Sequence, residues 1–358
     1  MDAQKLSLPL FQNDAPLPGE IAGHLRSIAK LVVQRKVQFL CGAGMSKASH
    51  CPLSSELAAK MVGEMLGADT SNDIKLLVGR YPFEAIAGAY LEIQDHLRLK
   101  KLIAEELDQG EGNLHAGHHA LEYLASQGYI DKIYTTNFDL LLEEAFGERK
   151  CSVTDDDAYL VHEARMQNKI AVIHLHGTLN SHKYRIDERD TYHLDTALAR
   201  VLMADMVTHW FIWVGYSLND VDLRSIYLSM RDMLARTDDL VKKPYVVHPL
   251  TDELDGEAKA KQLEVRLATA VWKARGATFI PLRAEEFLPA LVNHIRQIKG
   301  EEWAVLLAKQ FGFDPRNEDD LKQVWGKADR LRKEFSLDDK VAGMKMLAQK
   351  HGIEVSQS

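Results

Sequence analysis

The sequence predicts an α/β protein in which helices cover both faces of a parallel sheet, and two observations support this prediction. Short, continuous apolar runs recur at residues 37–41, 132–136, 169–175, 210–215, 244–248 and 277–281. Such runs are typical of strands that are buried on both faces. Stretches with the 3.6-residue period of a helix lie between them, at residues 140–146, 196–207, 221–234 and 256–275. This alternation predicts a Rossmann-like, doubly wound parallel sheet.

Two segments are longer than a connection between strands requires. Residues 54–127 separate the first two predicted strands and contain amphipathic patterns at 83–107 and 115–127, which predict a helical insertion beside the sheet. Residues 301–358 are charged and helical in pattern, at 301–310, 318–334 and 337–351. We expect this C-terminal helical tail to pack against another subunit or partner, or to cover the sheet. Residues 1–19, with three prolines, form the expected leader.

Composition and charge exclude several classes of protein. The 358-residue chain is 46% hydrophobic and 27% charged, which is ordinary for a globular protein. Its formal charge of -8 argues against nonspecific binding to a phosphate backbone, so direct nucleic-acid binding is not expected. No apolar run reaches the ~18 residues of a membrane span, and the first residues lack the pattern of a signal peptide. Three cysteines without metal-ligand spacing indicate a cytoplasmic protein with no zinc site.

Glycines follow the first predicted strand, where a doubly wound fold binds its ligand. Gly42, Ala43 and Gly44 allow a tight turn and a close approach of the backbone to a phosphate, and Ser46 can cap the next helix or contact the ligand. A turn without a ligand is the alternative interpretation. The loop lacks both the third glycine of a dinucleotide fingerprint and the lysine of a P-loop, which disfavours triphosphate binding of the P-loop type.

Hydrogen-bonding side chains follow the next predicted strand. Thr136, Asn137 and Asp139 lead into a predicted helix, so they are either ligand contacts or helix caps. The third strand ends with His174 and His176, which would share one face if the strand continued that far. A histidine with a pKa near neutrality suits a general base, whereas a metal pair lacks a third ligand and a packed histidine is the plain alternative.

Gly177 leaves room for a substrate beside His176, and Gly215 and Ser217 follow the fourth strand. Each of these loops has a purely structural interpretation, with Ser217 as a helix cap. The carboxyl ends of parallel strands meet at one edge of the sheet, so the four loops together predict a ligand site there.

Taken in order, these motifs resemble the sirtuin superfamily, and more closely its bacterial sirtuin-like branch found in antiphage defence. The matching segments are the GAG-x-S loop at 42–46, T-x-N-x-D at 135–139, His-Gly at 176–177 and G-x-S at 215–217. The resemblance spans roughly residues 20–300, which are the expected NAD-binding catalytic domain.

The resemblance implies roles for these positions. Asn137 would fix the nicotinamide ribose and the attacking group, and His176 would be the base, so these two are the expected catalytic residues. The expected NAD contacts are Gly42, Ala43, Gly44 and Ser46 at the pyrophosphate, Asp139 at the carboxamide, Gly215 and Ser217 at the adenosine, and the adjacent Thr136 and Gly177.

Departures from the family pattern decide between its activities. Deacylating sirtuins have a zinc module of two cysteine pairs and a Phe-Arg element after the first loop, and this chain has neither, with residues 50–56 reading HCPLSSE. Thr136 also stands where the family has glutamine. We therefore expect an NAD+ glycohydrolase that uses NAD as its substrate, without zinc. The alternatives are a zinc-free deacylase or ADP-ribosyltransferase, a non-catalytic sensor of NAD or ADP-ribose, and a structural subunit.

An enzyme that depletes NAD must be restrained until it is triggered. The resemblance implies abortive infection against phage, with control by homo-oligomerisation, a nucleotide signal, or a partner such as a HerA-type ATPase or an Argonaute-like protein. His115, His118 and His119 at the start of a predicted helix have surface or capping roles as the favoured interpretation, since no acidic or thiol partner is nearby. We expect residues 184–192, rich in Arg and Asp, to close over the substrate.

Overall fold

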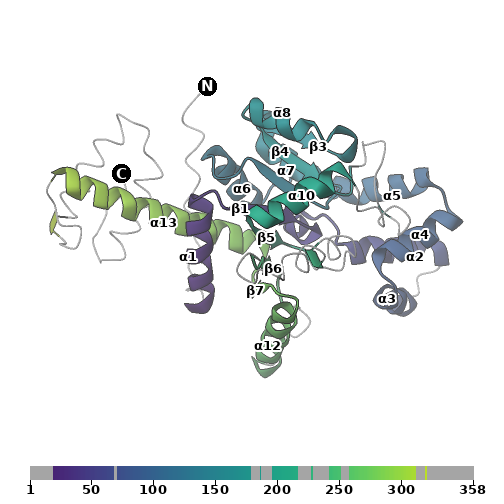
Figure 1. Ribbon diagram of the computed structural model, residues 1–358. Coiled ribbons are helices and arrows are strands. Elements are labelled where there is room, and N and C mark those ends of the chain that lie inside the picture. The colour runs from purple at the N-terminus through teal and green to yellow at the C-terminus, as the bar shows by residue number, and fades with distance from the viewer. Residues whose placement is uncertain are drawn as a thin grey trace. The chain divides into compact units, whose positions relative to one another are not determined.

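The structure is a computed structural model that describes residues 19–67, 71–178, 186, 196–216, 227–228, 242–250, 258–311 and 319–320 (Figure 1). The chain divides into two compact units. One comprises residues 35–287, and the other comprises both ends of the chain, residues 1–34 and 288–358.

A parallel sheet forms the centre of the larger unit. Its strands are β1 (Val37–Cys41), β2 (Lys132–Thr135), β3 (Lys150–Val153), β4 (Ile170–His174), β5 (Trp210–Val214), β6 (Tyr245–Val247) and β7 (Thr278–Ile280). The described part of the chain has seven strands in the order β3-β4-β2-β1-β5-β6-β7, and every neighbouring pair is parallel. The predicted Rossmann-like α/β class is therefore confirmed.

The order of the strands places the switch point of the sheet between β1 and β5. The chain first builds outward from β1 through β2 to β4 and β3, and then returns to the other side of β1 to add β5, β6 and β7. Ligands of doubly wound sheets bind beyond the carboxyl ends of the strands at such a point. The loops after β4, β2, β1 and β5 are consecutive along this edge.

Among the described strands, β3 is the one that the sequence pattern missed. It has no continuous apolar run, because Lys150 and Ser152 are exposed and only Val153 is fully buried. This is the alternating pattern of an edge strand with one buried face, and four residues are too few for the alternation to stand out.

Helices flank the sheet within this unit. One face of the sheet, through residues such as Tyr134, Ile173 and Trp213, packs in a hydrophobic cluster with side chains from three helices. These are α8 (Leu160–Met166), α10 (Ala197–Thr208) and α12 (Ala258–Ala274). The predicted helices at 140–146, 196–207 and 256–275 correspond to α7 (Leu141–Phe146), α10 and α12, whereas the one at 221–234 lies outside the described residues except for 227–228.

The segment between β1 and β2 contains helices, as expected. They are α2 (Ser54–Leu66), α3 (Ser71–Arg80), α4 (Phe83–Ile93), α5 (His96–Leu107) and α6 (Ala116–Ser126). The helix predicted over 83–107 is two helices, because the chain breaks at Gln94 and Asp95. The Asp95 carboxylate caps α5 by accepting a hydrogen bond from the Arg98 amide at 2.7 Å. Helices α2, α4 and α5 contribute most of a separate apolar cluster that includes Met61, Tyr90 and Ile103.

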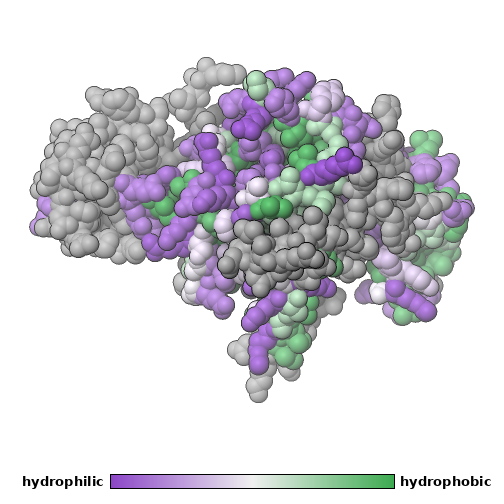
Figure 2. Space-filling model, viewed as in Figure 1, coloured by the Kyte–Doolittle hydropathy of each residue, from purple (hydrophilic) through white to green (hydrophobic). Residues whose placement is uncertain are grey.

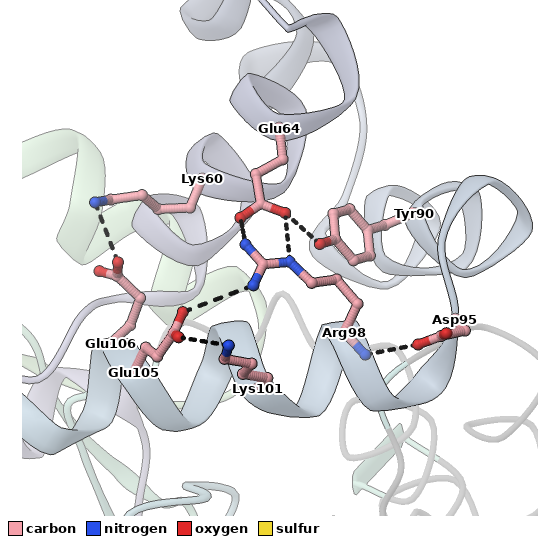
Figure 3. A network of polar contacts seen from close by, with 8 residues as sticks. All are labelled: Lys60, Glu64, Tyr90, Asp95, Arg98, Lys101, Glu105 and Glu106. Atoms are coloured by element: carbon pink, nitrogen blue, oxygen red, sulfur yellow. Dashed lines mark hydrogen bonds and ion pairs between the residues drawn. The ribbon is translucent and has the colours of Figure 1, made fainter.

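A polar network joins these three helices and includes Tyr90 of their apolar cluster (Figure 3). Glu64 of α2 accepts hydrogen bonds from the Arg98 guanidinium of α5 and, at 2.5 Å, from the Tyr90 hydroxyl of α4. Burial, together with the hydrogen bond and charge of Glu64, raises the pKa of Tyr90 to about 12. Tyr90 is therefore a neutral donor at physiological pH.

The smaller unit contains helix α1 (Gly19–Val33) and most of helix α13 (Ala284–Phe311). Within their unit, the Arg26 guanidinium of α1 lies 3.4 Å from the Glu301 carboxylate of α13. The helix predicted at 301–310 is the end of α13, and those at 318–334 and 337–351 lie outside the described residues except for 319–320. Among the described helices, none combines the length and the apolar character that a membrane span needs.

Apolar side chains remain exposed on α12. Leu263, Leu267 and Val271 recur every four residues, so they lie along one side of the helix, and each is about half exposed, between 46% and 58%. Figure 2 shows hydrophobic surface along this helix, which lies lowest in the view.

We expect Tyr90→Phe to lower the free energy of unfolding by about 1–2 kcal/mol, because it removes a hydrogen bond to a charged acceptor and retains the buried ring. Urea denaturation followed by circular dichroism measures this change. Tyr90→Ala, which also empties the space of the ring, should cost about 3–5 kcal/mol. A Tyr90→Phe variant as stable as the wild type would contradict the assigned role of the hydroxyl.

Candidate functional site

Most of the predicted site residues lie in loops at one edge of the sheet. Backbone hydrogen bonds extend the strand pairing into these loops: the Gly42 amide donates to Val214 at 3.0 Å, and the Thr136 amide donates to Cys41 at 3.1 Å. The Leu175 amide donates to Thr135 at 2.9 Å. The loops after β4, β2, β1 and β5 are thus held side by side. Ser217 lies outside the described residues.

The loops after β1 and β5 pack backbone against backbone. The Gly44 amide donates to the Gly215 carbonyl at 2.9 Å. A Cβ at Gly42 would lie 2.7 Å from the Gly215 oxygen, and one at Gly44 would lie 2.8 Å from its Cα. Gly215 has a φ of +64°, and a Cβ there would lie 2.2 Å from the Met45 nitrogen. Glycine is therefore required on both sides of this contact.

The amides of the first loop are largely engaged within the protein. Besides the amides of Gly42 and Gly44, the Ser46 amide donates to the Ala43 carbonyl at 3.1 Å, within consecutive 3-10 turns at Ala43–Met45 and Lys47–Ser49. In this conformation a phosphate would need other donors, such as the Ser46 hydroxyl.

Ser46, Asn137 and Asp139 lie together at this edge. The Asn137 side-chain amide donates to the Ser46 hydroxyl at 3.1 Å, and Ser46 is close enough to Asp139 to act on the pKa of its carboxyl group. Ser46 and Asn137 are only 1% and 8% exposed. Burial raises the pKa of the Asp139 carboxyl even though Ser46, the Leu141 amide and His174 oppose this. The cluster links the loops that follow β1 and β2.

Asp139 also hydrogen-bonds the first turn of the following helix. Its carboxylate accepts from the Leu141 amide at 3.2 Å, at the start of α7. The N-cap position of α7 is Leu140, so neither Asn137 nor Thr136 has the capping position that the sequence offered as an alternative, and Asp139 contacts the first helical amide. The Asn137 side chain is directed to Ser46 instead.

The two histidines near the end of β4 have different surroundings. Strand β4 ends at His174, and the chain then turns, with Gly177 at a φ of +75°. The expectation that His174 and His176 share a strand face is wrong, because the strand does not reach His176. His176 is half-buried in the turn, and His174 is fully buried.

Sequence reasoning missed the polar partners of His174. Its Nε2 lies 2.6 Å from the Glu143 carboxylate of α7, which also accepts from the Ser152 hydroxyl of β3 at 2.7 Å. Burial opposes charge on both groups, but their pairing prevails, so the pKa of His174 is raised and that of Glu143 is lowered. No spacing signal connects these residues, which come from three separate elements.

Helix α6 contacts the first loop through His115. Its Nδ1 accepts from the Gly117 amide at 2.9 Å, so the hydrogen is on Nε2, which donates to the Met45 carbonyl at 2.6 Å. Burial lowers the pKa of His115, which favours this neutral form. The capping role favoured by the sequence is confirmed for His115. His118, in contrast, is buried rather than at the surface.

No metal cluster is apparent at this edge. Across the described ranges, no three His, Cys, Asp or Glu side chains are grouped so that they could hold a metal ion.

The strand order and the glycine contact at its switch point define a doubly wound α/β protein with a candidate ligand site at β1 and β5. Residues 131–279 match the family model described as the SIR2-like domain. This part of the chain is therefore similar to the SIR2-like domain, which supports the resemblance to the sirtuin superfamily.

Individual relatives are distant. Over 220 residues the chain is 22% identical to the NAD(+) hydrolase ThsA of Cytobacillus dafuensis. The aligned segment covers 59% of this chain and 41% of that protein. The chain thus spans less than half the length of this curated relative.

Solved structures of Sir2 enzymes also match. One, from work on the mechanism and regulation of Sir2 enzymes, has a TM-score of 0.43 at 15% identity and covers 79% of this chain and 99% of its own. A Sir2 enzyme bound to a myristoylated histone peptide has a TM-score of 0.42 at 14% identity, covering 78% and 99%. A mutant Sir2 homologue in complex with 2'-O-acetyl ADP ribose has a TM-score of 0.44 at 16% identity, covering 76% and 96%.

We expect Gly215→Ala to destabilise the protein more than Gly67→Ala. Both glycines have a φ near +60°, which costs alanine about 1–2 kcal/mol, but nothing lies within 4 Å of a Cβ at Gly67. At Gly215 the new methyl group would also overlap backbone atoms of Gly44 and Met45. Urea denaturation of both variants tests this, and equal losses would show that the contact between the loops can relax.

We expect His118→Leu to make the protein less sensitive to acid. Burial lowers the pKa of His118 to about 3, so below about pH 6.5 the unfolded chain takes up a proton that the folded chain refuses. The associated stability is complete above pH 6.5 and is lost as the pH falls, at about 1.4 kcal/mol per unit. The measurement is the difference in unfolding free energy between pH 7 and pH 5. An unchanged difference in His118→Leu, with exposed His119→Leu as the control, would argue against a neutral His118.

Proposed function

We propose that this protein hydrolyses NAD+ at the bond between nicotinamide and ribose, releasing nicotinamide and ADP-ribose. The main support is that Asn137, hydrogen-bonded to Ser46, lies in a loop adjacent to that of His176 at the switch-point edge of a SIR2-like domain. The similarity to a protein named as an NAD(+) hydrolase supports the same activity. The lack of cysteine pairs argues against an acyl-peptide site of the zinc-dependent kind.

The chemistry requires orientation and a base. Nicotinamide in NAD+ is cationic and leaves with the electron pair of the broken bond without a general acid, and the ribosyl carbon gains oxocarbenium character. Water forms the new carbon–oxygen bond, and His176 accepts its proton. Asn137 holds the water and the ribose hydroxyls. Because the Asn137 NH₂ donates to Ser46, its carbonyl oxygen is the atom that would accept from these groups. A positioned base is worth about 10²–10⁴-fold in rate.

The remaining contacts follow the order of the loops. Ala43 and Ser46, in the glycine-containing loop, would bind the pyrophosphate, while Gly42 and Gly44 let that loop approach Gly215. Thr136, Asp139 and Gly177 would surround the nicotinamide. Gly215 and Ser217 would contact the adenosine.

In the cell, the proposed role is NAD depletion in cytoplasmic defence against phage, controlled by self-assembly or by a partner such as a HerA-type ATPase or an Argonaute-like protein. The exposed apolar side of α12, formed by Leu263, Leu267 and Val271, supports assembly because it lies uncovered by the described part of the chain.

The test is to incubate the purified protein with NAD+, alone and with lysate from phage-infected cells, and to follow nicotinamide and ADP-ribose by chromatography. We expect equimolar products without any protein acceptor. His176→Ala and Asn137→Ala should abolish NAD+ loss and still fold, whereas His119→Ala, on the exposed side of α6, should retain it.

Other outcomes assign the site to another class. Product formed only with an acylated peptide would indicate a zinc-free deacylase or transferase. NAD+ binding without turnover in both conditions would indicate a sensor. Turnover that persists when both side chains are removed would refute the catalytic assignment.

A further inference from the structure

A buried ion pair contacts the backbone carbonyl of Asn137 and has no part in the proposed chemistry. The side chains of His174 and Glu143 are 0% and 5% exposed. His174 Nδ1 lies 3.1 Å from the backbone carbonyl oxygen of Asn137, and Nε2 lies 2.6 Å from Glu143 Oε1. The imidazole thus bridges α7 and the loop that follows β2.

The partners of this ring define its protonation. A carbonyl oxygen and a carboxylate oxygen only accept hydrogen bonds, so both ring nitrogens must carry a hydrogen to satisfy them. A neutral ring would direct a lone pair at one of the two oxygens. If the missing hydrogen were that of Nδ1, the Asn137 carbonyl would lose its donor.

The charged groups around the ring favour the doubly protonated form. Glu143 faces it from α7 at hydrogen-bond distance, Asp139 contributes a second nearby carboxylate from the loop, and Ser152 of β3 supplies a neutral donor to Glu143. Burial opposes the charge, but the attraction of these carboxylates raises the pKa of His174.

We propose that protonated His174 is a positioning residue for Asn137, and that turnover at this site fails at alkaline pH when His174 loses its proton. The Nδ1 hydrogen fixes the carbonyl of Asn137 and with it the backbone from which the Asn137 amide reaches Ser46. This inference rests on the proposed NAD+ hydrolysis for its kinetic consequence, but not for the protonation of the ring.

The two histidines then govern opposite limbs of a bell-shaped pH profile. His176 must be neutral to accept a proton, so activity rises with pH on the acid side. His174 must be charged. Because its pKa is raised, its contribution is complete at lower pH and is lost as the pH rises through that pKa in the folded protein.

The experiment compares kcat against pH for the wild type, Glu143→Gln and Asp205→Asn. Glu143→Gln retains the shape and the acceptor for Ser152 but removes the charge that holds the proton on His174. We expect its alkaline limb to move to lower pH by about one unit, the lower end of what an adjacent opposite charge produces. The acid limb and KM should change little.

Asp205→Asn is the matched control. Asp205 is 8% exposed, accepts from the Tyr134 hydroxyl and pairs with Lys132 at 2.7 Å, so its neutralisation also perturbs a buried acid joined to β2. It should lower stability without moving the alkaline limb. An alkaline limb that is unchanged in Glu143→Gln, or moved equally in both variants, would overturn the inference.

A second measurement separates this inference from the proposed function. In protein labelled with ¹⁵N-histidine, the two ring nitrogens of His174, assigned by through-bond correlation to its backbone, should both be protonated at pH 7 and titrate at lower pH in Glu143→Gln. If the protein does not consume NAD+, the proposed hydrolysis fails while this spectrum still decides the charge of His174. A neutral ring at pH 7 would refute the inference even in an active enzyme.

Discussion

The close contact between the loops after β1 and β5 is the constraint on which the candidate site depends. Gly42 and Gly44 meet Gly215 at distances that leave no room for a side chain on either side. Because β1 and β5 flank the point at which the order of the strands reverses, this contact lies at the edge where a doubly wound fold binds its ligand. The polar groups of the neighbouring loops are positioned relative to this contact.

Two histidines contact loops at this edge, and their hydrogen-bond partners require different protonation states. His115 must be neutral, since its Nδ1 accepts from Gly117 while its Nε2 donates to Met45 in the first loop. His174 faces only acceptors, Asn137 and Glu143, and therefore needs both hydrogens. The loops are thus supported by a neutral contact from His115 at the start of α6 and by a charged contact from His174 at the end of β4.

The sequence was informative where a single segment carried the signal. Buried parallel strands such as β1 and β5 are continuous apolar runs, and the polar residues after them follow by position, so the edge of the site could be predicted. Strand β3 could not, since its side chains alternate between exposed and buried. The pairing of His174 with Glu143 and Ser152 was equally invisible, because it depends on contacts among three elements that no spacing rule relates.

The position of Ser152 has a consequence for how the site responds to local opening. Ser152 donates to Glu143 from β3, which is four residues long and, among the described strands, pairs with β4 alone. Edge strands of this kind fray at a lower free energy than the centre of a sheet. Fraying of β3 would expose Glu143 to water and weaken its electrostatic attraction for the His174 proton. Transient opening of an edge strand would then change the charge of the imidazole that contacts the Asn137 carbonyl.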